Sequence, residues 1–548
     1  MSLLQVIPLG GAGEIGKNCT VVRQGDEIIV VDCGLSFPHE EHYGVDIVIP
    51  DFTYLIENKH LIKGVFLTHA HEDHVGALSF FLRELQVPIF CTAFTEAMVR
   101  SKLEERHRGL EADIRQIKIG DTVRAGSMSV EPILVTHSIP ETCALAIRTE
   151  HGIVLFTADF KFDFSPVDGK LTNMARLAEI GEEGVVLLMT DSTNVDRPGW
   201  GPSESTVSIG LRSVFEAAPG RVLLTTFSSN IHRMQQALDV AKETGRKVSV
   251  AGRRMDTVLQ LCSRLGYLKF PKDVYVPLSD IGKYPANELC ILVTGSQGEP
   301  SAALSQMSRK EYSRLQIEKG DTILYSARPI PGNEGAIWRT VNRLFAMGAN
   351  VITDHPTPIH CSGHAYQEEL KMMVNLVKPF YVAPVHGEPR HQFLFSDLLR
   401  EMGHAEHRVF TLGNGDTLCL DDEKAWIGDP VPWGEVLIDQ HGNVPVTSEI
   451  LAQRASLGHE GVIVVTLGID FKSGVIEAKP EAMARGYSGP TDAILDALDD
   501  LSAALAGMRP EELQNRNVVE STVVEIVKRV INRRCQQRPV VIPAIIGM

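Results

Sequence analysis

Hydrophobic and polar positions in the first 200 residues alternate over short stretches. β-Branched runs bounded by glycine and polar turns predict strands at 3–10, 18–24, 27–34, 63–68, 87–91, 129–137, 143–149, 152–159 and 185–191. One helix with an apolar face is predicted over 76–85. Many strands with few helices between them favour a sandwich of sheets flanked by helices.

From about residue 205 the pattern becomes a regular alternation of strand, polar loop and amphipathic helix. Its strands are predicted at 221–226, 247–252, 290–295 and 322–327. Such alternation is typical of a parallel sheet covered by helices. Short strands return at 350–354, 380–388, 408–413 and 417–421. We expect these strands to complete the first sheets, which makes the alternating region an insertion.

The last hundred residues predict a small separate domain. Strands at 461–470 and 539–547 and helices at 491–507 and 521–535 follow a segment that we interpret as a linker. The predicted organisation is therefore α/β throughout. It consists of a sandwich domain in two parts at 1–205 and 351–438, an inserted βα domain at 206–350, a linker at 439–458 and a C-terminal α+β domain at 459–548.

Composition narrows the classes of function. The 548 residues are 44% hydrophobic with a formal net charge of -16, so a polyanionic partner must be held by local positive features and not by the global field. No apolar stretch approaches the roughly 20 residues of a membrane helix. No basic region precedes the first apolar run, so a secretory leader is not expected. Nine cysteines without a CxxC pair predict free thiols in a reducing cytoplasm.

The clearest chemical signal is the segment 69–74, His-Ala-His-Glu-Asp-His, directly after the predicted strand 63–68. Three imidazoles and two carboxylates within six residues offer nitrogen and oxygen ligands that suit zinc or manganese. In extended chain, His69 and His71 point to one side, while Asp73 and His74 at the turn reach a second position. Two metals about 3.5–4 Å apart would need further ligands.

Three further candidate ligands stand at the ends of predicted strands. They are His137 after 129–136, Asp159 after 152–158 and His386 in 380–388. A single histidine or aspartate at a strand end is usually an ordinary turn residue. Together with the segment 69–74, and in this order along the chain, these three residues predict a two-metal centre.

At this point the chain resembles the ribonuclease J family, the β-CASP branch of the metallo-β-lactamase superfamily. The resemblance covers essentially the whole chain. The motifs that carry it are GGAGEIGKN at 10–18, VDCG at 31–34, THAHEDH at 68–74, TADF at 157–160, TDSTN at 190–194, TTFSSNIHR at 225–233, VTGSQGEP at 293–300, HCSGHA at 360–365 and APVHGE at 383–388.

The resemblance implies a metallo-β-lactamase αββα sandwich with an inserted β-CASP domain, and it assigns metal ligands. One metal would be held by His69, His71 and His137, and the other by Asp73, His74 and His386. Asp159 would bridge both. Asp32 would orient ligands without binding metal.

The same resemblance implies a mechanism. A metal-activated hydroxide would attack a phosphodiester phosphorus in line. The β-CASP motifs map to Asp191, His364 and His386. His364 would stabilise developing charge or protonate the leaving oxygen, and Asp73 would assist as a proton acceptor.

Two segments are expected to grip the substrate. Serine and glycine at the start of a helix leave N–H groups free for an anion. The first segment is His360, Cys361, Ser362, Gly363 and His364, and the second is Ser228, Ser229 and Asn230 with His232 and Arg233. In the family the second region receives the 5′ end of RNA, which implies preference for a 5′-monophosphate. The segment 296–299 is interpreted as an ordinary capped helix.

The family also implies features outside the catalytic centre. Gly44, Asp46 and Asp439 resemble positions that hold a structural calcium in some members. The C-terminal domain is expected to support a homodimer, with a tetramer as the next larger assembly and RNA-degradation proteins as partners. Basic residues of the helix 521–535 are expected to lie on a solvated face.

These observations predict a cytoplasmic two-metal ribonuclease with 5′-to-3′ exonuclease and endonuclease activity in mRNA decay and rRNA maturation. One alternative is a hydrolase of the same superfamily acting on a thioester or a lactam, which would not need the inserted domain. Another is a non-catalytic RNA-binding subunit, which would not need every ligand. Zinc versus manganese, and the balance of exonuclease and endonuclease action, stay open at this stage.

Overall fold

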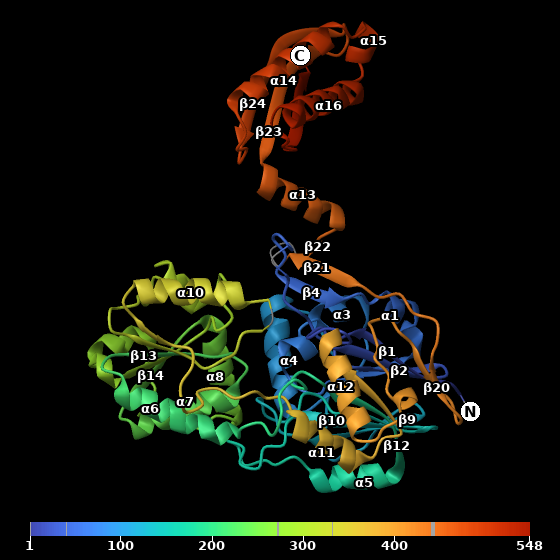
Figure 1. Ribbon diagram of the computed structural model, residues 1–548, viewed down its shortest axis with the longest axis vertical. Helices are drawn as coiled ribbons and strands as arrows, with labels where there is room; N and C mark the ends of the chain where they lie inside the picture. Colours follow the sequence, from blue (N-terminus) through green and yellow to red (C-terminus); the bar gives the residue numbers. More distant parts are fainter. Residues whose placement is uncertain (1, 40, 271–272, 331, 440–443, 548) are drawn as a thin grey trace. The chain divides into compact units, whose positions relative to one another are not determined.

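The computed structural model describes residues 2–39, 41–270, 273–330, 332–439 and 444–547. The chain divides into two compact units (Figure 1). Unit 1 comprises Met1–Phe37 and Val48–Val436, and unit 2 comprises Pro38–Ile47 and Leu437–Met548. Within the described residues, no helix is both long and apolar enough to cross a membrane.

Unit 1 contains a mixed eight-stranded sheet. Its strands, in sheet order, are β20 (Ala425–Ile427), β19 (Leu418–Leu420), β1 (Leu4–Gly10), β2 (Cys19–Gln24), β3 (Glu27–Val31), β5 (Ile62–Phe66), β6 (Ile89–Cys91) and β7 (Ile114–Gln116). The half from β20 to β3 is antiparallel, and the half from β3 to β7 is parallel. The N-terminal strand therefore pairs with a strand from beyond residue 415.

A six-stranded sheet packs against this first sheet. Its strands, in order, are β18 (Tyr381–Val385), β12 (Val185–Asp191), β11 (Gly152–Phe156), β10 (Cys143–Thr149), β9 (Met128–Leu134) and β8 (Val123–Ala125). A buried core between the sheets joins Val22 and Phe66 of the first sheet to Leu145 and Met189 of the second. Alternating hydrophobic positions along these strands supply this core.

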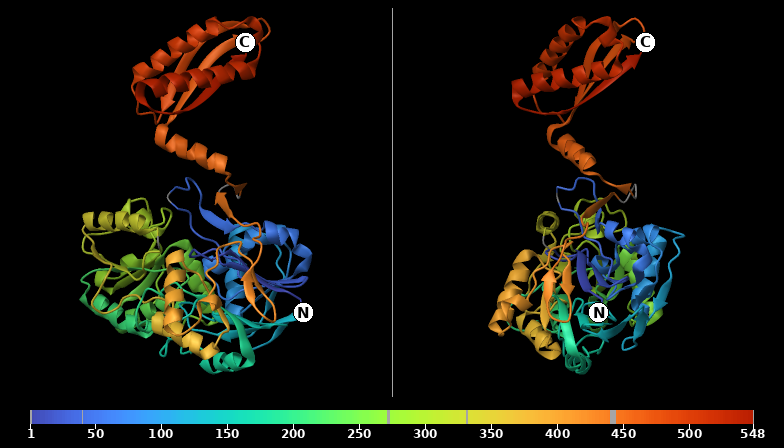
Figure 2. Two further views of the ribbon diagram at one scale, coloured as in Figure 1. Left: turned by 45° about the vertical axis from the view of Figure 1, so that its right-hand side comes forward. Right: turned by 90° about the vertical axis from the view of Figure 1, so that its right-hand side faces the viewer.

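Helices cover the outer faces of both sheets (Figure 2). Those of the six-stranded sheet are α5 (Met174–Gly184), α11 (Gln367–Val377) and α12 (Pro389–Glu401), whose apolar faces share a buried core with the strands. The blue helices on the opposite side are α1 (Thr53–Glu57), α3 (Leu78–Glu84) and α4 (Ala93–Arg106), with the short α2 (Glu72–Val75) beside them. The expected αββα sandwich is confirmed.

A five-stranded parallel sheet forms the inserted domain of unit 1. Its order is β14 (Lys247–Ala251), β15 (Leu289–Val293), β13 (Val222–Thr225), β16 (Thr322–Tyr325) and β17 (Asn350–Ile352). Its helices are α6 (Val207–Ala217), α7 (Ile231–Glu243), α8 (Arg253–Leu265), α9 (Ala303–Ser308) and α10 (Glu334–Ala346). Separate cores lie on the two faces of the sheet, as the regular alternation of the sequence predicts.

Unit 2 has its own three-stranded sheet, ordered β24-β23-β25. The elements are α13 (Ser448–Glu460), β23 (Val462–Asp470), β24 (Val475–Arg485), α14 (Thr491–Ala506), α15 (Pro510–Leu513), α16 (Arg516–Cys535) and β25 (Val540–Gly547). Helices α14 and α16 bury one face of the sheet in a core that contains only residues of this unit. The expected C-terminal α+β domain is confirmed.

The remaining elements are short. They are β4 (Ile47–Pro50), β21 (Glu435–Asp439), β22 (Val444–Pro445) and the 3-10 turns Lys59–Leu61, Glu204–Thr206, Leu278–Lys283, Ala286–Glu288 and Glu406–Arg408.

The local pattern misses several elements. Helix α13 lies in the segment expected to be a linker. The sequence does not predict this helix because it has no apolar stripe, and none of its side chains is buried. Strand β24 is half-exposed along its whole length and has no β-branched run. The strand expected at 408–413 forms only an isolated bridge at Val409.

Candidate metal centre and active site

The candidate site lies where the carboxyl ends of four strands meet. Strand β5 leads to His69, β11 to Asp159, β12 ends at Asp191, and β18 leads to His386. The backbone is left-handed at His386, with φ of 52°, and at Ala158 next to Asp159, with φ of 55°. Such conformations cost about 1–3 kcal/mol for residues other than glycine, and surrounding structure must enforce them. The fold therefore turns these side chains inward at an energetic cost.

The first predicted ligand group is assembled. His69 Nε2 lies 3.1 Å from His71 Nδ1, and His137 Nε2 lies 3.2 Å from the same His71 atom. Asp159 Oδ2 is 3.6 Å from both His69 Nε2 and His137 Nε2. Three imidazole nitrogens and one carboxylate oxygen therefore converge on one position.

The second predicted group lies on the other side of Asp159. Oδ1 of Asp159 is 3.3 Å from His74 Nε2 and 3.0 Å from His386 Nδ1. Asp73 Oδ2 is 3.1 Å from His386 Nε2 and 3.6 Å from His74 Nε2. Asp159 thus presents one oxygen to each group, which is the arrangement expected of a bridging carboxylate.

Burial keeps the first group in the protonation state that binds metal. Desolvation lowers the pKa of His71 to about 3 and that of His137 to about 4, and it holds the pKa of His69 well below its ordinary value. Neutral imidazoles keep a lone pair for coordination. The three side chains are therefore ready to act as ligands near neutral pH.

The second group is charged. Burial opposes ionisation of Asp159, but neighbouring histidines, first His386, outweigh it and hold the pKa of Asp159 well below its ordinary value. The pKa of Asp73 is lowered in the same way by His74 and His386 against burial. In return, despite burial, Asp159 and Asp73 raise the pKa of His386 to about 10. The carboxylates of this group therefore favour positive charge at the position that a cation would occupy.

The residues present fit divalent cations. The ligand atoms of each group lie within 4.8 Å of one another. The groups are His69, His71, His137 and Asp159, then Asp73, His74, Asp159 and His386, and finally Asp159, Asp191, His364 and His386. Histidine nitrogen and carboxylate oxygen suit zinc and manganese alike.

A layer of side chains behind the ligands sets their orientation. Asp32 Oδ2 lies 2.8 Å from His74 Nδ1, and its Oδ1 accepts a 2.8 Å bond from the Thr68 backbone N–H. Asn18 Nδ2 donates to the Asp73 carbonyl at 3.0 Å. A Cβ atom on Gly34 would lie only 1.7 Å from that same carbonyl oxygen. Asp32 therefore lies where a ligand-orienting residue is expected.

The sequence singles out the GGAGEIGKN and VDCG motifs without assigning roles to Asn18 or Gly34. Both motifs hold the loop that carries Asp73 and His74. The Gly11 carbonyl also accepts a 2.7 Å bond from the His386 backbone N–H. The local signal for this role is the density of glycines in GGAGEIGKN.

His364 is oriented by a buried carboxylate. Its Nδ1 lies 2.8 Å from Asp191 Oδ2. Burial lowers the pKa of His364, but Asp191 outweighs burial and the net shift is upward. The adjacent Gly363 carbonyl lies 2.8 Å from His137 Nδ1, and a Cβ on Gly363 would lie 2.6 Å from that imidazole. The loop 360–364 and the first ligand group are therefore in direct contact.

The expected substrate segments differ in exposure. Ser362 and His364 are half-buried, whereas Cys361 is buried and its thiol donates to Glu204 Oε2 at 2.6 Å. Arg233 is fully buried, and its guanidinium donates to Glu204 Oε1 and to the Ser326 carbonyl. Direct substrate contact by Arg233 is therefore a correction to the sequence-based expectation, because the fold surrounds the side chain completely.

The remaining residues of the second segment lie at the start of α7. Asn230 caps this helix, its Oδ1 accepting a 2.9 Å bond from the Arg233 N–H. Ser228 and Ser229 precede it and are half-buried. His232 Nε2 is 3.7 Å from Asp168 Oδ2. This segment reaches the loop 360–364 through Arg233, whose Nη1 is 3.5 Å from His360 Nδ1.

The expected calcium residues belong to unit 2. The Arg454 guanidinium donates to the Gly44 carbonyl at 2.9 Å and to Asp439 Oδ2 at 3.1 Å. Asp46 donates its backbone N–H to the Ile438 carbonyl at 3.0 Å. Among the described residues, the cation shared by Gly44 and Asp439 is this guanidinium. The Arg454 guanidinium therefore bridges Gly44 and Asp439, and the calcium site stays a prediction.

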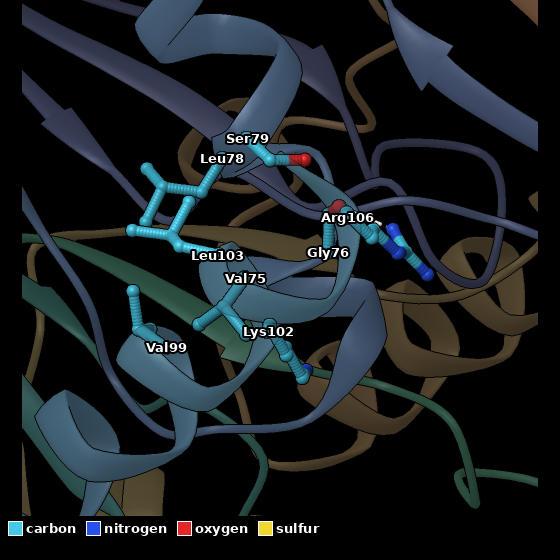
Figure 3. A pocket seen from close by; sticks show the side chains of 8 residues that line it. All are labelled: Val75, Gly76, Leu78, Ser79, Val99, Lys102, Leu103 and Arg106. Atoms are coloured by element: carbon cyan, nitrogen blue, oxygen red, sulfur yellow. Dashed lines mark hydrogen bonds between the residues drawn. The ribbon is translucent and has the colours of Figure 1, made fainter. Parts of the chain in front are cut away.

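Basic side chains support the metal loop from behind. Lys102 Nζ is 3.2 Å from Glu72 Oε2, Arg106 donates to the Gly76 carbonyl at 3.1 Å, and Arg254 of α8 pairs with Glu72 Oε1. Lys102 and Arg106 project from α4 beside a small pocket between α2, α3 and α4 (Figure 3). None of the predicted metal ligands is among the residues that line this pocket.

Four family models match the chain. Their descriptions are "Metallo-beta-lactamase superfamily" for residues 12–239, "Ribonuclease J, beta-CASP domain" for 219–344, "Zn-dependent metallo-hydrolase RNA specificity domain" for 357–411 and "Ribonuclease J C-terminal domain" for 449–548.

Curated relatives match the chain over most of its length. Ribonuclease J2 of Bacillus subtilis (strain 168) is 36% identical over 99% of this chain and 98% of its own length. Ribonuclease J of Thermus thermophilus is 39% identical over 99% of this chain and 95% of its own length. Ribonuclease J of Synechocystis is 41% identical over 88% of this chain and 75% of its own length.

A solved structure shares the fold. The crystal structure of a protein of unknown function from Enterococcus faecalis V583 matches with a TM-score of 0.54 and 17% identity, covering 76% of this chain and 100% of that chain. The relatives match both sandwich parts, the inserted domain and the C-terminal domain, and the ligands assemble on that fold. The chain therefore belongs to the ribonuclease J family of metal-dependent RNA hydrolases, in the β-CASP branch of the metallo-β-lactamase superfamily.

Proposed function

We propose that this ribonuclease degrades and matures RNA with both 5′-to-3′ exonuclease and endonuclease activity, preferring a 5′-monophosphate end. Two divalent cations per chain, zinc or manganese, serve the reaction. The observation that carries this proposal is Asp159, whose two oxygens face separate histidine groups 3.0–3.6 Å away. The relatives supply the coarse activity, RNA hydrolysis.

The proposed mechanism divides the work between the metals and the side chains. Bound cations supply an activated water and neutralise charge on the reacting phosphate. His69, His71 and His137 hold one position as neutral ligands. His364, oriented by Asp191 at 2.8 Å, donates a hydrogen bond to the developing charge or protonates the leaving oxygen. Asp73 assists as a proton acceptor.

The proposed substrate grip uses two loops at strand ends. Ser362 and Gly363 in the loop 360–364, and Ser228 and Ser229 before α7, offer hydroxyl and backbone N–H donors to phosphate oxygens. A pocket that fits a monophosphate would be overfilled by a triphosphate, which adds charge that few local cations offset. This argument favours degradation from a 5′-monophosphate end.

We also propose assembly and compartment. A homodimer, and beyond it a tetramer, would use the open sheet face of unit 2, where Val475, Met483, Ile542 and Ile546 are exposed. Proteins of an RNA-degradation complex are further partners. All nine cysteines are free, which favours the reducing cytoplasm.

The proposal is tested with labelled RNA in three forms: 5′-monophosphorylated, 5′-triphosphorylated and circular. With zinc or manganese supplied, we expect fast loss of the first, slow loss of the second and internal cuts in the third. The double variant Asp73→Ala with His74→Ala should remove all three activities while keeping the circular-dichroism spectrum of the wild type.

Two outcomes would reject the proposal. One is wild-type-like RNA turnover by the double variant. The other is hydrolysis of nitrocefin or a glutathione thioester by a wild-type enzyme that leaves all three RNAs intact. Metal analysis giving about two ions per wild-type chain and fewer in the variant checks the ligand assignment independently.

A further inference from the structure

A buried charged network lies beneath the loop 360–364. Arg233 is 0% exposed, Cys361 3% and Glu204 6%. These residues come from three segments: the turn before α6, the first turn of α7 and the loop before α11. Burying two charges is costly unless they are paired and hydrogen-bonded, so this network needs a physical reason.

The charges pair closely. Arg233 Nε lies 3.0 Å and its Nη2 2.5 Å from Glu204 Oε1. The other carboxylate oxygen, Oε2, accepts the Cys361 thiol at 2.6 Å. One carboxylate thus joins the inserted domain to the substrate loop, with a different oxygen for each.

The same arginine reaches the other end of the loop. Its Nη1 donates to the Ser326 carbonyl at 3.0 Å and to the Ile359 carbonyl at 3.2 Å. Ser326 Oγ also donates to the Ile359 carbonyl, at 2.5 Å. The backbone at Ile359 and the side chain of Cys361 are therefore both anchored to one buried guanidinium–carboxylate pair.

A second cation completes the support. Lys161 Nζ donates to the Pro202 carbonyl at 2.7 Å and to the Ser362 carbonyl at 3.3 Å. Residues 359–362 are thus held from inside the protein. The next two residues, Gly363 and His364, lie toward the candidate active site, because Gly363 contacts His137 and His364 contacts Asp191.

A comparison within the chain separates support of the loop from ordinary stability. Arg221 and Asp321 form another buried pair in the inserted domain, with Nε–Oδ1 at 2.8 Å and Nη2–Oδ2 at 2.6 Å. These two residues precede the amino ends of β13 and β16, whereas the loop 360–364 is reached from the carboxyl ends. Arg221 binds both carboxylate oxygens of Asp321, whereas both nitrogens of Arg233 bind Oε1 of Glu204. Within the described part of the chain, the other side-chain partners of the Arg221–Asp321 pair are Gln316 and Glu318, and neither belongs to the loop 359–364.

We propose that Glu204 and Arg233 are positioning residues that set the geometry of the loop 359–364 for binding the 5′ phosphate of RNA, and that neither contacts the RNA. This inference rests on the proposed function. A positioning role explains why these charges are buried. The loop needs a fixed shape, and directional hydrogen bonds to one carboxylate fix that shape better than apolar packing does.

The test compares Glu204→Gln with the matched control Asp321→Asn. Each change keeps the side-chain shape and leaves a buried arginine facing a neutral amide. We expect similar losses of melting temperature in both. For 5′-monophosphorylated RNA, Glu204→Gln should raise KM about tenfold with kcat within about threefold, whereas Asp321→Asn leaves both at the wild-type values. The preference for 5′-monophosphate over 5′-hydroxyl ends should fall only in Glu204→Gln.

A second pair of variants keeps the inference testable if Glu204→Gln does not fold. Cys361→Ala removes the bond to Glu204 Oε2 with little loss of volume and should raise KM. Cys361→Ser restores a donor to the same oxygen and should return KM toward the wild-type value. Rescue of this kind is not expected from a residue that only fills space.

The outcomes of these measurements distinguish failure of the positioning role from failure of the proposed function. An unchanged KM and end preference in Glu204→Gln and Cys361→Ala, or equal changes in Asp321→Asn, would overturn the positioning role while RNA hydrolysis by the wild type still supports the proposed function. A wild type that does not hydrolyse RNA would reject the proposed function first. If the wild type cleaves RNA at the same rate whatever its 5′ end, KM for RNA becomes the deciding measurement. The positioning role is then supported only if Glu204→Gln raises this KM.

Discussion

Two buried carboxylates, Asp159 and Glu204, each contact two different groups through their two oxygen atoms. Asp159 turns Oδ2 toward His69 and His137 and Oδ1 toward His74 and His386. Glu204 does the same with Arg233 on one oxygen and Cys361 on the other. A carboxylate can join two groups in this way because its two oxygens point in different directions.

The buried carboxylate of Glu204 makes the free energy of unfolding depend on pH in the acidic range. Burial opposes its ionisation, but Arg233 and Cys361 outweigh burial and lower the pKa of Glu204 from 4.5 to about 2. A lowered folded-state pKa contributes stability above about pH 4.5 that is lost as the pH falls toward 2. The shift corresponds to about 3 kcal/mol.

We therefore expect the free energy of unfolding to differ between the wild type and Glu204→Gln by an amount that is constant from pH 7 to 5. The difference should shrink by about 3 kcal/mol between pH 4.5 and 2. Urea unfolding followed by circular dichroism across this range measures it. A difference that stays constant down to pH 2 would contradict the lowered pKa.

At the scale of elements, ion pairs join the inserted domain to the metal loop. Arg254 of α8 pairs with Glu72 of α2, which stands between the proposed ligands His71 and Asp73. The same arginine lies 3.4 Å from Glu105 Oε2 of α4. Burial opposes ionisation of Glu72, yet Lys102, Arg254 and Arg106 lower its pKa to about 2. The position of α8 and the shape of the ligand loop are therefore coupled.

A double-mutant cycle tests this coupling. Arg254→Ala and Glu72→Ala together should destabilise the protein less than the sum of the single changes, by about 1 kcal/mol, because each single change already breaks the pair. We expect this small coupling energy because the Arg254 side chain is about a third exposed and solvent partly screens its charge. Thermal unfolding of the four proteins gives the coupling.

The neighbouring Arg253 provides the matched control. It is exposed on the same turn of α8, and Arg253→Ala with Glu72→Ala should be additive within about 0.5 kcal/mol. Equal coupling for both arginines would show a general charge effect and would contradict the specific pair.

At the scale of the whole molecule, the two units have separate cores. The buried core of unit 2 contains only residues between 463 and 545. Every proposed metal ligand, from His69 to His386, lies in unit 1. Stabilisation by a bound metal is therefore confined to unit 1, because a ligand stabilises only the structure that binds it.

Removal of metal should separate the two unfolding transitions. We expect EDTA to lower the unfolding temperature of unit 1 and to leave that of unit 2 unchanged in differential scanning calorimetry. The double variant Asp73→Ala with His74→Ala serves as the control, since it loses one ligand group and EDTA should lower its unit 1 transition less than that of the wild type. A shift of both wild-type transitions would contradict independent units.

The local sequence pattern predicts much of this architecture. Regular alternation predicts the strands β13 to β16, and residues at predicted strand ends supply His137, Asp159 and His386. The assignment of the strand expected at 350–354 to the first sheets is wrong, because β17 pairs with β16 at the edge of the inserted sheet. Helices α4, α5 and α12 of the sandwich and α6 at the start of the inserted domain are not predicted, because the prediction in these segments follows β-branched runs and not helical stripes. Placing the residues into metal, catalytic and substrate roles depends on resemblance to the family.

By itself, the sequence determined which chemical groups are available and at which strand ends they stand, because periodicity and spacing are local properties of the chain. The tertiary structure decided where each side chain lies. Arg233 is adjacent to helix-capping residues and reads as a phosphate ligand, yet it is enclosed and paired with Glu204, 29 residues away. Burial and charge pairing arise only when distant segments meet, so folding alone turned an apparent substrate contact into an internal support.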